Sequence, residues 1–148
     1  MVHLKPHSKD ANESHFVTAV YSRELGRWIF MDPDFGGYFM DEDGNILGIP
    51  EIRRRLISGA PLVVNQDVRG FTMVLGKGSY PWYLSKNIFR YACSQRSEFD
   101  HETERKNRID YELIPDGYRD ELLLEPEITK RGSKIVYTND EDFFWQNP

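Results

Sequence analysis

The chain has 148 residues, of which 39% are hydrophobic, 14% aromatic and 29% charged, as expected for one globular domain with an aromatic-rich core. Its net charge of −5 argues against a nucleic-acid-binding surface, which is normally basic. A single cysteine excludes a disulfide within the chain, and no apolar run reaches the roughly 18 residues of a membrane span. The N-terminus lacks the apolar segment of a signal peptide, so the expected location is the cytoplasm by default.

The first half of the sequence predicts two hairpins. Residues 13–22 and 27–32 are rich in β-branched and aromatic side chains, and Gly26 between them favours a turn. A second hairpin is predicted for residues 37–40 and 46–48, because an Asp-Gly-Asn sequence between them favours a tight turn.

Two helices are predicted. Residues 50–59 begin with a proline, which suits a first helical turn, and end with a glycine, while Ile52, Leu56 and Ile57 form an apolar face. Residues 79–92 are expected to form the second helix. The remaining predictions are extended structure for residues 61–75, 108–114 and 133–138 and a charged surface segment for residues 94–107. The expected fold class is α+β, a mostly antiparallel β-sheet with a few short helices.

The first hairpin raises a question of chemistry because a histidine and an aspartate lie near its open end. If Ser22 pairs with Arg27 across a four-residue loop, Val17 lies directly opposite Asp32. His15 is then the diagonal neighbour of Asp32 on the same face of the sheet. Diagonal neighbours are close enough for an imidazole and a carboxylate to form a hydrogen bond. An odd-length loop or a bulge would instead place the two side chains on opposite faces.

A histidine bonded to a carboxylate through one ring nitrogen has a fixed tautomer and a more basic second nitrogen. This is what a nucleophilic enzyme requires of its general base. The structural alternative is that His15 only ends a strand and Asp32 only begins an Asp-Pro turn.

Residues 13–65 resemble the second half of the transglutaminase-like domain, a superfamily of cysteine enzymes with a papain-like catalytic arrangement. The resemblance rests on His15 in an H-x-V-x-x-V context and on Trp28 and Asp32 in a W-x-x-x-D-P context. The tail YTNDEDFFWQNP is similar to the ending of bacterial members that carry a C-terminal extension.

The resemblance implies a papain/transglutaminase-like core lacking its N-terminal Cys helix. Residues 1–75 would be the His/Asp sheet half and residues 76–148 an extension packed on the same core, forming a single domain overall. In the family the nucleophilic cysteine precedes the histidine on a helix, but no cysteine precedes His15 here. We therefore expect either the C-terminal portion of a larger protein or a relative without the nucleophile, inactive as this chain alone.

The activity implied by the resemblance is Cys-His-Asp amide hydrolysis or acyl transfer, as in a peptidase, amidase or transamidase. His15 and Asp32 would be catalytic, Trp28 would contact the substrate, and the substrate would be a protein or peptide amide. No metal or organic cofactor is implied. The alternative is a non-catalytic binding or scaffold module that keeps the fold without the nucleophile.

Three further expectations concern other parts of the chain. Cys93, at the end of the predicted second helix, is expected to be a structural thiol, although a Cys93-dependent hydrolase would be possible if the thiol lay near His15. A missing helix would leave Val17, Phe30 and Trp28 exposed, and the chain would self-associate through this face. The calcium-loop-like run at residues 32–43 and the Gly-Lys-Gly-Ser sequence before the second helix are expected to be turns.

Overall fold

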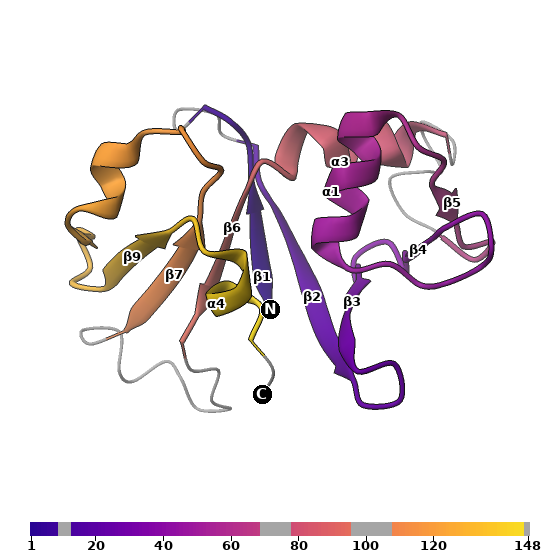
Figure 1. Ribbon diagram of the computed structural model, residues 1–148, viewed down its shortest axis with the longest axis horizontal. Helices are drawn as coiled ribbons and strands as arrows, with labels where there is room; N and C mark the ends of the chain where they lie inside the picture. The colour runs from indigo at the N-terminus through magenta and orange to yellow at the C-terminus, as the bar shows by residue number, and fades with distance from the viewer. Residues whose placement is uncertain (9–12, 69–77, 96–107, 147–148) are drawn as a thin grey trace.

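A computed structural model describes residues 1–8, 13–68, 78–95 and 108–146. A seven-stranded sheet has the order β3-β2-β1-β6-β7-β9-β8, and all its strand pairs except β7–β9 are antiparallel (Figure 1). Its strands are β1 (Val2–Lys5), β2 (His15–Ser22), β3 (Arg27–Met31), β6 (Arg90–Ser94), β7 (Ile109–Leu113), β8 (Glu127–Ile128) and β9 (Lys134–Thr138). The predicted α+β class with a largely antiparallel sheet is confirmed.

The first hairpin has the predicted register. Ser22 pairs with Arg27, and the pairing continues to Thr18 and Met31 without a bulge. The exposed fraction alternates at the open end of β2, where Val17 is fully buried and Phe16 is 46% exposed. One face of the hairpin, which carries His15 and Asp32, therefore points into the core.

Helix α1 (Ile49–Ser58) forms where it was predicted, with Pro50 in its first turn and Gly59 in the left-handed conformation at its C-cap. Glycine adopts this conformation without the steric cost that a side chain would add. Its buried face differs from the expectation, because Ile49 and Ile52 are buried whereas Ile57 is 75% exposed.

The predicted second helix is too long. Helix α3 (Ser79–Asn87) ends at residue 87, and Arg90–Ser94 form strand β6 between β1 and β7. Apolar residues continue at helical spacing as far as Tyr91, but they belong to two elements. Leu84 reaches the core from helix α3, and Tyr91 reaches the same core from strand β6. Backbone pairing on both sides of β6 outweighs the local helical pattern.

The second predicted hairpin is only partly formed. A tight turn joins Met40 and Ile46 through one isolated bridge. Strand β4 (Phe39–Met40) pairs instead with β5 (Val63–Val64), and these two form a separate small sheet. The expected extended segment at 61–75 is therefore confirmed only at β5, and residues 69–75 lie outside the described residues, as do residues 96–107 of the expected surface segment.

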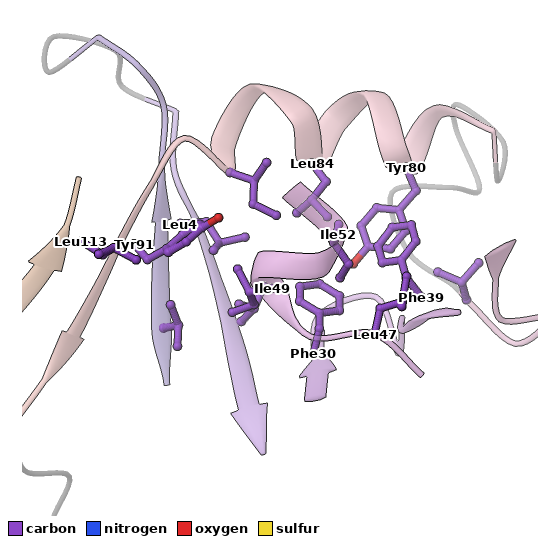
Figure 2. Packing of buried hydrophobic residues seen from close by; sticks show 14 residues of the cluster. Leu4, Phe30, Phe39, Leu47, Ile49, Ile52, Tyr80, Leu84, Tyr91 and Leu113 are labelled. Carbon is purple, nitrogen blue, oxygen red and sulfur yellow. The ribbon is translucent and has the colours of Figure 1, made fainter. Parts of the chain in front are cut away.

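The core lies between the sheet and the two longer helices. Helices α1 and α3 cover the β1–β3 part of the sheet, and short helix α4 (Glu141–Phe144) contacts β7 (Figure 1). Figure 2 shows apolar side chains from the sheet, α1 and α3 meeting in one cluster, with Ile52 of α1 between Phe30 of the sheet and Leu84 of α3. Tyr91 and Leu113 extend the cluster across the sheet. A 3-10 helix, η3 (Asp120–Leu123), precedes β8.

The expectation that the His15 face is exposed is wrong. Val17 and Phe30 are fully buried, because α1 and α3 cover this face, and Trp28 is half-buried. Self-association stays a prediction, but its stated cause, an apolar face left open, does not hold for these residues.

Candidate functional site

His15 and Asp32 form a buried pair. Nε2 of His15 lies 2.6 Å from Oδ2 of Asp32, and the exposed fractions of the two residues are 5% and 1%. Both side chains leave the sheet on its covered face, as the register of β2 and β3 requires. The predicted contact is thus present, in the diagonal position derived from the strand pairing.

The carboxylate of Asp32 has a partner on each oxygen. Oδ1 accepts the backbone N–H groups of Asp34 and Phe35 at 3.1 and 3.3 Å, which is the usual bonding of an aspartate that begins a turn. Oδ2 accepts the hydroxyl of Tyr80 in addition to facing His15. The turn role and the histidine partnership therefore coexist in one side chain and are not alternatives.

Tyr80 reaches Asp32 from helix α3. Its ring is fully buried, stacks on Phe39 at a centroid distance of 5.0 Å, and lies edge-on to Phe35. Burial, followed by the charge of Asp32, raises the pKa of the Tyr80 phenol well above its ordinary value. The hydroxyl therefore stays protonated and remains a hydrogen-bond donor to the carboxylate across the physiological pH range.

The turn after β3 is closed by its own backbone and by Asn65. Asp32 and Gly37 exchange two backbone hydrogen bonds of 2.8 and 3.0 Å. The buried Asn65 side chain donates to the carbonyl of Gly36 and accepts the N–H of Tyr38. These contacts fix the backbone of the turn and so the position of Asp32 beside His15.

Aromatic side chains surround the imidazole of His15. Phe35 stacks on it at a centroid distance of 5.2 Å, and Tyr83 of α3 lies edge-on at 5.5 Å. Burial, then the charges of Asp32, Glu13 and Asp34, raise the pKa of Tyr83. Because Nε2 is used by Asp32, Nδ1 is the nitrogen left to exchange a proton with a reacting group.

Trp28 lies on the same strand face as Asp32 but four residues away, which is roughly 13 Å along a strand. Its indole N–H donates to the backbone carbonyls of Trp145 and Gln146. The structure thus shows Trp28 holding the C-terminal segment. Its predicted contact with a substrate stays a prediction.

Cys93 does not meet His15. It lies on β6, not at a helix end as expected, and β1 separates it from β2, with Val2 opposite both Cys93 and Val17. Two strand spacings separate the thiol's strand from that of His15, which amounts to about 10 Å or more. Burial also raises the pKa of the Cys93 thiol, which disfavours a reactive thiolate.

His15, Asp32 and Asp34 each offer one ligand atom, and these atoms lie within 4.8 Å of one another, a spacing that meets the geometric condition for holding a metal ion. The bonding of Asp32 opposes this use. Both of its oxygens already accept hydrogen bonds, and Oδ2 faces the imidazole directly. A cation would have to displace these partners, whereas a proton-transfer role uses them as they stand.

Two residues of this site were not identified from the sequence. Tyr80 is only one position of the predicted second helix, and Asn65 only the last residue of the resembling segment. Their bonds to the turn join residues 48 and 29 positions apart, so no local pattern could show them.

Comparison of the chain with protein-family models, with curated proteins and with solved structures finds no match. Among the described residues, every helix is too short or too polar to cross a membrane.

Proposed function

We propose that His15 and Asp32 are the general base and its orienting carboxylate in a transglutaminase-like Cys-His-Asp site with a papain-like core. The observation that supports this most is the buried contact of 2.6 Å between Nε2 and Oδ2, which leaves Nδ1 for chemistry. Two protein groups, the Tyr80 hydroxyl and the Asp32–Gly37 turn, hold the carboxylate in place. A carboxylate fixed in this way orients an imidazole for repeated proton transfer.

The reaction proposed for this dyad is acyl transfer from an amide to a thiol. Nδ1 of His15 takes the thiol proton as the sulfur attacks the amide carbonyl carbon, and then gives the proton to the departing amine as the C–N bond breaks. The thioester that forms is attacked by water, which gives hydrolysis, or by an amine, which gives transamidation. The thiol is released in either case.

The nucleophilic thiol is not Cys93, because β1 lies between its strand and that of His15. Cys93 is also the single cysteine of the sequence. The proposal therefore requires a thiol that this sequence does not contain, and it treats the chain alone as inactive.

The test uses the natural gene product, isolated from its source cells with any segment that precedes residue 1. Ammonia release from a glutamine-containing peptide and incorporation of a fluorescent amine would measure hydrolysis and transamidation. We expect an activity that iodoacetamide abolishes. His15→Asn and Asp32→Asn should lower it about a thousandfold or more, whereas Cys93→Ser, remote from the dyad, should retain it.

Two results would contradict the proposal. The first is an activity that survives in His15→Asn. The second is a natural product that begins at residue 1 and has no amide activity, which would leave the non-catalytic module as the function of this fold.

A further inference from the structure

Strand β2 is longer than its neighbour β1. Pairing between them begins with Val2 opposite Val17, whereas β2 continues to Ser22 and remains paired with β3 over that whole length. Among the described residues, none is paired with β2 on the β1 side beyond Val17. Within the described part of the chain, one edge of β2 is therefore open over its second half.

The direction of the backbone groups on this edge follows from β3. The N–H of Phe30 donates to the carbonyl of Leu47 at 2.9 Å, so Phe30 directs its backbone groups away from β2. Ala19 is the partner of Phe30, and the two members of such an antiparallel pair both point outward. The N–H and C=O of Ala19, and by alternation those of Tyr21, therefore face the open edge.

A cavity of about 380 Å³ adjoins this edge. Its lining includes Ala19, Trp28 and Trp145 from the covered face of the sheet and Phe16, Arg108 and Asp110 from the opposite face. The cavity therefore borders both faces of the sheet. It does so at the N-terminal end of β1, where β2 and β6 diverge (Figure 1).

We propose that an extended segment of a partner polypeptide docks here as an added strand beside β2. The N–H and C=O groups of Ala19 and Tyr21, which pair with no other backbone among the described residues, match a partner with the same alternating backbone groups. An extended peptide supplies them at the strand spacing of about 4.8 Å. Strand addition of this kind gains affinity from the backbone and specificity from alternate side chains.

The lining also sets the chemistry of the partner. Trp28 and Trp145 offer aromatic surface on the covered face, so the partner's residues on that side should be apolar. The charges on the opposite face are already paired, with Arg108 bonded to Asp110 at 2.7 Å and Lys5 bonded to Glu112. Uncharged polar residues suit this side because they leave both pairs intact. The partner segment therefore alternates apolar and neutral polar side chains.

The inference is tested by amide hydrogen exchange measured by NMR. The probe is an acetylated and amidated peptide of three Val-Thr repeats, and the control replaces each threonine with proline, which removes N–H donors. With millimolar probe, exchange at Ala19 and Tyr21 should slow by about tenfold or more. Thr18 and Val20, whose N–H groups face β3, are internal controls and should exchange slowly throughout.

Each other outcome overturns the proposal. Equal protection by both peptides, or by neither, would show that strand addition does not occur at this edge. Protection of Ala19 and Tyr21 without peptide would mean that the edge is already covered. If that protection rises with protein concentration in parallel with dimer formation, the occupant is a second copy of the chain.

Discussion

Tyr80 and His15 meet the same atom, Oδ2 of Asp32, from opposite elements of the fold. The histidine comes from β2 in the sheet, and the tyrosine comes from α3, which covers that sheet. Asp32 is thus the point where the covering helix and the hairpin are joined by polar contacts inside an apolar core. Changes at this point should affect both stability and the geometry of the dyad.

Removing the hydroxyl of Tyr80 should destabilise the protein. Tyr80→Phe deletes a hydrogen bond to a buried carboxylate and keeps the ring, so the free energy of unfolding should fall by about 1.5–3 kcal/mol. Urea denaturation measures this change. Tyr21→Phe, at a half-buried tyrosine on the hairpin, should change stability by less than about 0.5 kcal/mol. Equal effects of the two variants would mean that the Tyr80 contact adds no stability.

Gly37 should be intolerant of any side chain because Tyr80 packs against its backbone. A Cβ at position 37 would lie 2.9 Å from Cε1 of Tyr80, too close for the ring to stay in place. Gly37→Ala should therefore lower the free energy of unfolding by about 1–3 kcal/mol. Gly78→Ala is the matched control, since a Cβ there meets no atom within 4 Å.

A double-mutant cycle identifies the cause of the Gly37→Ala effect. In a Tyr80→Leu background the close approach is gone, so adding Gly37→Ala should cost less than half of its cost in the wild type. Additive costs would show that the effect comes from the backbone of the turn and not from the tyrosine.

A buried charge cluster on the opposite face of the sheet should be essential for stability. Glu112 is 1% exposed and accepts hydrogen bonds from Lys5 and Arg90, each at 2.5 Å. Glu112→Gln would leave the 4% exposed Arg90 without its counter-charge, so we expect a loss of about 3–5 kcal/mol in the free energy of unfolding. Thermal and urea denaturation measure it.

The control for this variant is Glu121→Gln. Glu121 also pairs with an arginine, Arg119, but both side chains are exposed to solvent. An exposed pair contributes less than about 1 kcal/mol. A Glu112→Gln protein as stable as Glu121→Gln would show that Arg90 is not left as an uncompensated buried charge.

His3 should make stability depend on pH. Burial, then the charge of Lys5, lowers its pKa from 6.5 to about 4 in the folded state. As the pH falls from about 6.5 towards 4, the unfolded chain binds a proton at His3 and the folded chain does not. The free energy of unfolding therefore decreases. After allowance for the ring's partial exposure, we expect a contribution of about 1–2 kcal/mol.

His3→Gln removes this titration. Urea denaturation at several values between about pH 7 and pH 4 should show a shallower decline of stability in the variant than in the wild type. Parallel curves for the two proteins would mean that His3 takes up its proton equally well in the folded and unfolded states.

Local sequence patterns predict the first hairpin and the His15–Asp32 contact well, because both depend on short-range rules. Strand parity and loop length are enough to bring His15 beside Asp32, and a proline and a glycine are enough to bound α1. The α+β class follows from the same patterns.

Features that depend on distant partners are not predicted. Arg90–Ser94 continue a helical apolar spacing, but their pairing with β1 and β7 makes them a strand. The Tyr80 bond to Asp32 and the Glu112 cluster join side chains far apart in the sequence. Each is fixed by tertiary packing, for which a single sequence carries no local signal.

The most direct test of the account is the tautomer of His15, read from long-range proton–nitrogen NMR spectra of the imidazole at mildly alkaline pH. We predict that Nε2 carries the proton, because Oδ2 of Asp32 accepts it, and that Nδ1 is unprotonated. Asp32→Asn should change this state or yield a mixture of tautomers. A proton on Nδ1 in the wild type, or identical spectra for the two proteins, would contradict the dyad and with it the proposed function.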